Sequence, residues 1–407
     1  MPPSVQAPAR EPEQLDFESE VVACNGTEVE LADTYFFAES GGQPADRGTL
    51  GGVEVADVYY ADGRTVHVLA EPPECSVGDR VDGVIDAEFR RYCQRAHTAS
   101  HVVYGAARRE LDELGYGGFA VDQEKVRIDV ESDSAIDDAM LITLEEHANR
   151  AVWESRSVDW YSMSTDDAMA APDVAFNVAT EEEVFSDASE VRIVEITGWD
   201  RAACGGTHVR NTAEIGLIRM LDRSNPGSGL TRVEFAVGPT AIDHQARLHA
   251  DARRAARTAD ATPGRLTDAI QEMRSVIETR DDRVRTLERM VLEERLATAP
   301  RTESNDLTWV VQTVPEVETD TTTTVLRDQR DHGVEDVFVT VSGESRSSIS
   351  VGTNGDVDAS EVINRVTDTL GGGGGGGSEL AQGGGIPHEP EHIVASLRED
   401  IVPDLQT

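Results

Sequence analysis

His97-Thr98-Ala99-Ser100-His101 and Cys204-Gly205-Gly206-Thr207-His208 are the two segments around which the middle of this chain is expected to fold. Each segment places two metal-binding side chains four residues apart. If the fold brings the segments together, they offer three imidazole nitrogens and one thiolate to a single ion, and this donor set favours zinc.

The first segment lies within a predicted helix over residues 86–114, so its two histidines, at positions i and i+4, project from one face. The residues between them include no glutamate, which excludes the zinc-protease pattern that carries its general base in that turn. Taken alone, ordinary hydrogen bonds explain these histidines better than a metal does, and the second segment alone is a weaker signal. The two segments together predict one zinc ion per chain, with His97, His101, Cys204 and His208 as its ligands.

A zinc site of this kind suits the hydrolysis of an activated acyl ester, because the ion makes water more acidic and polarises a carbonyl group. The coordination number remains open at this point. If all four side chains bind, the site is closed and structural by default. Catalysis requires an open position, a fifth ligand, or one of the four side chains acting from outside the coordination shell.

With 407 residues the chain is too long for one core, and its pattern predicts an α+β protein of several domains. Short runs bounded by glycine, aspartate or proline predict a small N-terminal β-barrel, and mixed strands and helices follow it. The expected parts are a disordered N-terminus (1–16), the barrel (17–88), an α+β domain (89–239), a helical hairpin linker (240–298) and a C-terminal α/β domain (299–407).

The linker is predicted as two helices that break at Pro263-Gly264. Its second helix carries an apolar stripe at helical spacing, formed by Leu266, Ile270, Met273, Ile277, Val284, Leu287 and Val291. Packing within the hairpin explains this stripe most simply, and dimerisation through it is the alternative.

The C-terminal domain contains the glycine run Gly371–Gly377 and a second glycine triplet, Gly383–Gly385. A run of this kind is typical of a flexible linker. Because this run lies inside a domain, a Gly-rich loop whose backbone amides contact a phosphate backbone explains it equally well.

The formal net charge is -41, and the acidic residues are spread over the whole length. Lys125 is the only lysine. An even charge of this size indicates a surface adapted to high salt, where self-repulsion is screened, and hence a salt-loving source. At such salt the electrostatic attraction of RNA is weak for any protein, so the charge neither supports nor excludes an RNA partner.

Four cysteines are present, and three of them (Cys24, Cys75 and Cys93) are expected to be reduced and to pack as small apolar residues. No apolar run approaches the roughly 20 residues needed to span a bilayer, and the polar N-terminus does not resemble a secretory signal. We therefore expect a cytoplasmic protein.

The motifs resemble those of the long form of the alanyl-tRNA editing proteins called AlaX, which are related to the editing and C-terminal domains of alanyl-tRNA synthetase. The resemblance covers nearly the whole chain from about residue 14. Its matching segments are Phe36–Gln43, His97–His101, Cys204–Gly216 and the Gly371–Gly385 region. With the acidic composition, this suggests a halophilic archaeon as the source.

The resemblance implies a hydrolase that deacylates tRNA(Ala) mischarged with serine, and with glycine as a second substrate. A synthetase pocket cannot strongly reject an amino acid that merely adds a hydroxyl or lacks a methyl group, so a second site removes the error. In the family the HxxxH and CxxxH side chains hold zinc, which carries over to the four ligands named above. The helical linker and the Gly-rich domain are associated there with homodimers and tRNA binding.

The resemblance also implies that Gln43 lines the editing pocket or contacts the tRNA end, with Gly41, Gly42 and Thr207 as further substrate-binding residues. The family commonly has a polar side chain some 16 or 17 residues after the second histidine, near the substrate hydroxyl, and here Gly117 and Gly118 occupy those places. Ser100 is the candidate replacement and, with His97 and His101, the candidate catalytic residue; a hydroxyl that bonds its own helix backbone is the alternative.

Only about sixteen residues precede the barrel, so we expect editing in trans, without ATP and without aminoacylation. Two other functions remain open. One is a tRNA-binding protein whose zinc is structural, and the other is a zinc hydrolase of a small acyl ester.

Overall fold

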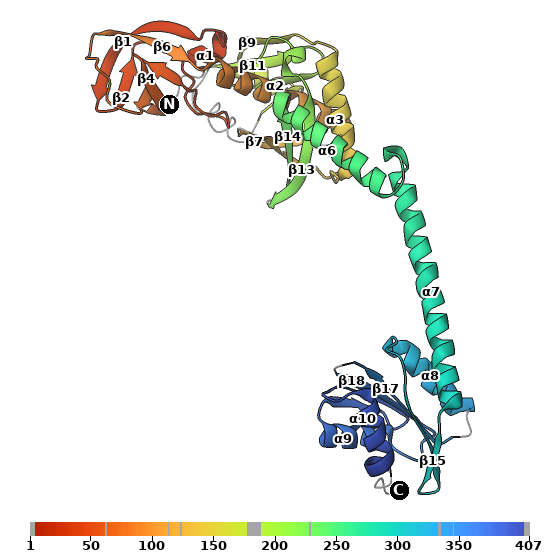
Figure 1. The fold of residues 1–407 in the computed structure, drawn as a ribbon. Helices are drawn as coiled ribbons and strands as arrows, with labels where there is room; N and C mark the ends of the chain where they lie inside the picture. The colour runs from red at the N-terminus through yellow and green to blue at the C-terminus, as the bar shows by residue number, and fades with distance from the viewer. Residues whose placement is uncertain are drawn as a thin grey trace. The chain divides into compact units, whose positions relative to one another are not determined.

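The chain divides into two units, residues 1–254 and 255–407, each with its own sheets and core. Figure 1 shows the computed structural model, which describes residues 5–61, 63–112, 114–122, 124–176, 189–227, 229–332, 335–344 and 346–402. The predicted multidomain α+β architecture is confirmed.

Six antiparallel strands close into a barrel in the order β1-β2-β5-β4-β3-β6. Inward and outward residues alternate along them, most regularly in β6, because successive side chains of a strand point to opposite faces. The predicted small barrel is confirmed. The strands are β1 (Asp16–Asn25), β2 (Glu28–Leu31), β3 (Gly48–Leu50), β4 (Val53–Ala61), β5 (Arg64–Leu69) and β6 (Arg80–Ile85).

The segment that precedes the barrel is ordered over residues 5–16 and includes a short helix, α1 (Ala7–Arg10). The buried side chain of Gln6 exchanges two hydrogen bonds with the backbone of Ala38, at 3.0 and 2.8 Å. The carbonyl of Pro12 accepts hydrogen bonds from Arg90 and from a second side chain of the same helix. The prediction of disorder is therefore wrong for this segment, because bonds to residues far along the chain order it; residues 1–4 lie outside the described residues.

Beside the barrel, two helices pack against each other and cover the apolar faces of two four-stranded sheets. They are α2 (Ala87–Glu110) and α3 (Asp138–Trp153). One sheet has the order β13-β14-β8-β7 and the other β10-β12-β11-β9. Their strands are β7 (Gly115–Val121), β8 (Val126–Glu131), β9 (Val158–Ser164), β10 (Val174–Ala175), β11 (Glu190–Ile196), β12 (Asp200–Ala203), β13 (Ile218–Gly227) and β14 (Leu230–Val237).

Shorter elements connect these strands, and two longer helices follow them. They are α4 (Thr165–Ala170), η1 (Thr212–Ile215), α6 (Gly238–Thr258), η2 (Pro263–Arg265) and α7 (Leu266–Thr298). The break between α6 and α7 falls at the Pro-Gly pair, as the sequence predicts. Six members of the apolar stripe on α7 are exposed, among them Ile277 at 56%.

The second unit contains a six-stranded sheet of order β15-β16-β17-β18-β20-β19, with helices packed against it. Its strands are β15 (Arg301–Ser304), β16 (Leu307–Thr313), β17 (Val337–Gly343), β18 (Ser347–Thr353), β19 (Gly373–Gly376) and β20 (Leu380–Ile386). Its helices are α8 (Thr319–His332), α9 (Ala359–Leu370), α10 (Pro390–Ser396) and η3 (Leu397–Ile401).

The glycine run is not a loop, which corrects the prediction. Gly373–Gly376 and Leu380–Ile386 form an antiparallel hairpin at the edge of the sheet. The two strands approach so closely that a Cβ at Gly374 would lie 2.4 Å from the carbonyl oxygen of Gln382. Gly374 and Gly376 therefore serve packing at this edge, where a side chain would push the strands apart.

All four cysteines are free thiols; Cys93 is buried and the others are partly buried. Among the described residues, no helix combines the length and the hydropathy that a membrane crossing requires.

Candidate metal centre and its pocket

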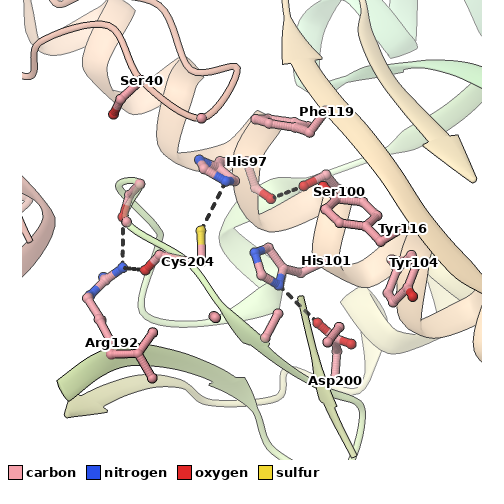
Figure 2. A pocket seen from close by; sticks show the side chains of 17 residues that line it. Ser40, His97, Ser100, His101, Tyr104, Tyr116, Phe119, Arg192, Asp200 and Cys204 are labelled. Carbon is pink, nitrogen blue, oxygen red and sulfur yellow. Dashed lines mark hydrogen bonds and ion pairs between the residues drawn. The ribbon is translucent and has the colours of Figure 1, made fainter. Parts of the chain in front are cut away.

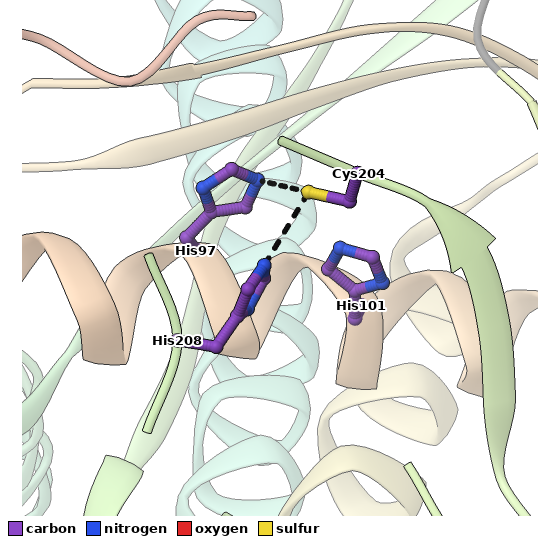
Figure 3. Close-up of side chains that lie close together, drawn as sticks. All are labelled: His97, His101, Cys204 and His208. Atoms are coloured by element: carbon purple, nitrogen blue, oxygen red, sulfur yellow. Dashed lines mark hydrogen bonds between the residues drawn. The ribbon is translucent and has the colours of Figure 1, made fainter. Parts of the chain in front are cut away.

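Helix α2 carries the first ligand pair on a long, well-capped segment. The side chain of Asp86 accepts hydrogen bonds from the backbone N–H groups of Glu88 and Phe89, which satisfies donors that the first turn leaves unpaired. From this start, His97 and His101 come to lie on the buried face, at 5% and 8% exposure. The second pair follows β12, whose end directs the Cys204 turn toward α2 (Figure 3).

The two motifs meet as the sequence predicts. The Cys204 Sγ lies 3.2 Å from Nε2 of His97 and 3.3 Å from Nε2 of His208. With His101, the four donor atoms all lie within 4.8 Å of one another. A tetrahedral zinc ion with these ligands requires about 3.5 Å between sulfur and nitrogen. The size and chemistry of this cluster therefore fit a zinc ion.

His97 is held from behind by Gln43. The Oε1 atom of Gln43 lies 3.0 Å from Nδ1 of His97 and accepts a 2.9 Å hydrogen bond from the backbone N–H of Thr207. The Nε2 of Gln43 donates to the Thr207 hydroxyl at 3.0 Å. Because a carbonyl oxygen only accepts, Nδ1 of His97 carries the proton and Nε2 is left free for the metal.

The other two histidines have the same arrangement. Nδ1 of His101 donates to the carboxylate of Asp200 at 2.9 Å. Nδ1 of His208 lies 3.1 Å from the Thr98 hydroxyl, whose own proton is donated to a helix carbonyl. Each imidazole thus has an acceptor on Nδ1, which sets its tautomer and turns Nε2 toward the cluster.

The protonation states of the cluster suit metal binding. Burial alone would raise the pKa of Cys204, but its interactions with the neighbouring His97, His208 and His101 outweigh it and hold that pKa well below the usual 9.0. Burial places the pKa of His208 well below 6.5, so this ring is neutral. Against burial, the hydrogen bond to Asp200 raises the pKa of His101 to about 10. Metal binding here is therefore coupled to release of a proton.

A cavity of about 130 Å³ opens onto the cluster (Figure 2). Three aromatic rings form part of its wall: Phe119 stacks on His97 with ring centroids 4.4 Å apart, and Tyr104 meets Tyr116 edge to face. The opposite wall is the glycine turn after Cys204. This volume is large enough for several water molecules or a small acyl group beside the cluster.

The remaining residues proposed from the sequence occupy three kinds of position. Ser100 and Gly41 line the cavity, and the Ser100 hydroxyl donates a 2.7 Å hydrogen bond to the carbonyl of His97. Gln43 and Thr207 are fully buried against His97. Gly42 packs against the backbone of Phe119, where a Cβ would lie 1.9 Å from the carbonyl oxygen.

Three residues that hold the site were missed in the sequence. Asp200 and Thr98 orient two of the histidines, and Arg192 donates to the carbonyls of Cys204 and Gly206 at 2.7 and 3.0 Å. Arg192 is 4% exposed. Thr98 lies inside the first motif, but nothing in the helical pattern distinguishes it from an ordinary helix residue. No local sequence pattern marks Asp200 or Arg192 as part of the site.

Two family models match parts of the chain. The model described as the threonyl and alanyl tRNA synthetase second additional domain matches residues 191–234, and the DHHA1 domain matches residues 306–402. The first range includes Cys204 and His208.

Curated relatives match over a longer range. The alanine–tRNA ligase of Methanopyrus kandleri is 30% identical, over 96% of this chain and 44% of the relative. That of Natronomonas pharaonis is 32% identical, over 92% of this chain and 41% of the relative. The chain thus spans less than half the length of these relatives. Among solved structures, the C-Ala domain from Aquifex aeolicus alanyl-tRNA synthetase is 28% identical, covering 26% of this chain and 98% of its own, with a TM-score of 0.23.

The two matched models lie in different units of the fold, and the ligase matches extend across both. The chain is homologous to domains of alanyl-tRNA synthetase, including its editing-related domain.

Proposed function

We propose that this protein hydrolyses the ester bond of mischarged tRNA(Ala), removing serine and, as a second substrate, glycine. One observation carries the proposal. Three imidazole Nε2 atoms and one thiolate converge beside a small cavity, within a region homologous to the editing-related domain of alanyl-tRNA synthetase. The cavity has room for an acyl group, and the cluster beside it would bring a bound metal close to that group.

In this proposal His97, His101, Cys204 and His208 hold one zinc ion. When bound, zinc supplies a Lewis acid that polarises the ester carbonyl and makes water more acidic at neutral pH. The four side chains fit this ion because their donor atoms are close together and each imidazole has a hydrogen-bond partner at Nδ1, which leaves Nε2 for the metal.

The other side chains position these donors and shape the cavity. Gln43 keeps a proton on Nδ1 of His97, and Asp200 does the same for His101. Phe119, Tyr104 and Tyr116 form the apolar wall that limits access of bulk water to the acyl group. The Ser100 hydroxyl donates to the helix backbone and has lone pairs left to accept a hydrogen bond from a serine hydroxyl, so it is our candidate for recognising serine.

The protein would act in trans, in the cytoplasm, on tRNA that a synthetase has already charged. It would need no ATP, since ester hydrolysis is itself favourable. Dimers through the exposed stripe on α7 and a halophilic archaeal source are further parts of the proposal, supported by the apolar side chains of that helix and by the net charge of -41.

The decisive experiment measures release of serine from seryl-tRNA(Ala) in molar KCl, with zinc-loaded protein and with protein treated with a chelator. We expect hydrolysis by the loaded protein and at least a hundredfold loss after zinc removal, restored when zinc is added back. Alanyl-tRNA(Ala) serves as the substrate control and should be spared. No release of serine by protein that contains one zinc per chain would refute the proposal.

A His97→Ala variant tests the ligand assignment separately. We expect it to lose both zinc and activity, whereas His147→Ala, which removes a histidine beside Glu110 outside the cluster, should retain both. A His97→Ala protein that keeps its zinc and its rate would show that the metal is bound elsewhere.

A second candidate, a tRNA-binding protein with structural zinc, is favoured by one observation: four donor atoms lie within 4.8 Å of one another, which is the number that a closed tetrahedral site requires. This candidate predicts tRNA binding without hydrolysis and loss of folded structure on zinc removal. Equal hydrolysis of a small seryl ester and of seryl-tRNA would instead indicate a general acyl esterase.

A further inference from the structure

Beside the metal cluster lies a group of arginines around one tryptophan, which we call the Arg–Trp patch: Arg10, Arg192, Arg210 and Trp160. The Arg210 guanidinium lies over the Trp160 ring at 3.9 Å from its centroid, and that of Arg192 lies at 5.1 Å. The indole N–H of Trp160 donates to the carbonyl of Arg10 at 3.3 Å. Four residues from three distant parts of the chain thus meet at one place.

The patch adjoins the candidate metal centre. Arg210 follows the ligand His208 by two residues. Arg192 forms part of the cavity lining and bonds the backbone of the Cys204 turn (Figure 2). An RNA strand that contacts Arg210 would therefore have its end near the cavity in which the acyl group is proposed to lie.

The positive charge of this patch is poorly neutralised, although the chain as a whole carries a net charge of -41. Among the described residues, no ion pair within 4.0 Å involves Arg10 or Arg192, and the Arg192 guanidinium bonds backbone carbonyls instead. Arg210 pairs only with Glu13, at 3.6 Å, and both side chains are more than half exposed, so this pair is weak. The protein without RNA therefore holds several positive charges close together, and a bound anion would reduce their mutual repulsion.

The exposed members of the patch have the shape that unpaired nucleotides require. The guanidinium of Arg210 is planar and lies over the indole of Trp160, and the side chain is 51% exposed. Unpaired bases stack on such planes, and arginines nearby contact phosphates.

We propose that Arg210 stacks an unpaired base of the RNA 3′ strand while Arg10 contacts a phosphate of the same strand. The inference rests on the proposed function in taking tRNA as the ligand, and it identifies where so acidic a protein admits a polyanion. Arg192 acts as a positioning residue, because it is buried and its bonds go to the backbone of Ala9, Cys204 and Gly206.

The test measures binding rather than hydrolysis, on the full zinc-loaded chain. The probes are uncharged tRNA(Ala) and a single-stranded RNA decamer that ends in CCA, titrated at several KCl concentrations. We expect Arg210→Ala to raise the Kd about tenfold and Arg210→Lys to raise it nearly as much, because lysine keeps the charge but has no plane for stacking.

Arg10→Ala should lower the slope of log Kd against log[KCl] by about 0.7, the value for one phosphate contact on a single strand, and Arg10→Lys should keep the slope. Arg127→Ala is the matched control, since it removes an exposed arginine of β8, outside the patch, and should leave Kd and slope unchanged. Circular dichroism and zinc content report that each variant is folded.

Three results would overturn the inference: no RNA binding by the wild type, an unchanged Kd and slope in the Arg10→Ala, Arg210→Ala double variant, or equal binding of polyglutamate, which would indicate charge attraction without base contact. RNA binding through the patch without any release of serine would refute the proposed hydrolase and leave the Arg–Trp patch intact. The experiments can therefore refute either proposal without refuting the other.

Discussion

Gly205 and Gly206 are adjacent in one turn, yet their surroundings differ. A Cβ at Gly206 would lie 2.1 Å from Cε1 of His97, whereas a Cβ at Gly205 would meet no atom within 4 Å. We therefore expect Gly206→Ala to push His97 out of line and to weaken zinc binding about 10- to 100-fold, as the loss of ligand orientation does at other metal sites. Gly205→Ala should keep the zinc.

Competition against a chelating dye measures both affinities, with the wild type in parallel. Equal affinities for the two variants would contradict the close contact between the turn and the His97 ring, and with it the geometry of the proposed site.

A second residue-scale prediction concerns His67, which is fully buried in the wall of the barrel. Its Nδ1 donates to the carbonyl of Val29 at 3.0 Å, and its Nε2 accepts from the hydroxyl of Thr34 at 2.8 Å, so the ring is neutral. Burial lowers its pKa from 6.5 to about 4, although the hydrogen bond to Val29 raises it.

The folded barrel therefore binds fewer protons at His67 than the unfolded chain does between these pH values. The contribution to stability is complete above pH 6.5 and declines as the pH falls toward 4, by about 3 kcal/mol in total. Urea unfolding of the wild type and of His67→Gln, compared at several pH values, isolates this contribution from that of the many carboxylates. Parallel pH profiles for the two proteins would contradict it.

The four side chains of the cluster were predictable from the sequence because each pair lies within one turn. The residues that orient them were not. Asp200 and Thr98 reach their histidines across 99 and 110 residues of sequence, and no local pattern encodes such a pairing. Gln43 was singled out, but it was expected at the substrate, and its burial against His97 and Thr207 follows only from the fold.

At the scale of elements, the edge hairpin of the second unit offers a matched pair of glycines. A Cβ at Gly374 would lie 2.4 Å from the Gln382 carbonyl oxygen and 2.7 Å from Cγ2 of Ile363, whereas a Cβ at Gly375 would meet nothing within 4 Å. We expect Gly374→Ala to lower the free energy of unfolding of this unit by about 1–3 kcal/mol, as overpacking does. Gly375→Ala should be neutral or slightly stabilising, because it restricts the unfolded chain.

Hydrogen exchange of the amides in β18 and β20, measured on the full chain, reports the stability of this unit apart from the rest. Similar protection in both variants would show that the hairpin can open without cost to the sheet.

The same hairpin shows which kind of element could not be predicted from the sequence. Helices such as α2 and α7 carry an apolar period and recognisable ends, so their positions followed from the sequence. The glycine run has no side chains and hence no apolar period. Its extended form depends on the pairing of β19 with β20, which in turn pairs with β18. The N-terminal segment failed as a prediction for a related reason, since its order comes from the distant partners of Gln6 and Pro12.

At the scale of the whole molecule, the net charge of -41 sets the conditions under which both units fold. Many of the ion pairs are exposed, such as Arg80–Glu18 and Arg254–Asp251, and exposed pairs offset little of the repulsion among the surplus carboxylates. That repulsion extends over about 10 Å at 0.1 M salt and about 3 Å at 1 M. Stability should therefore depend strongly on ionic strength.

We expect the Tm to rise by more than about 5 °C between 0.1 and 1 M KCl, equivalent to one or two kcal/mol for domains of this size. The rise should level off above 1 M, because screening is then nearly complete, whereas a general salting-out effect would continue to increase. Sodium chloride at the same ionic strength is the control and should give the same curve, since screening does not distinguish the cations. A Tm that stays flat from 0.1 to 1 M, or that climbs only in the molar range, would mean that charge repulsion does not limit the fold and would remove the physical basis for a halophilic origin.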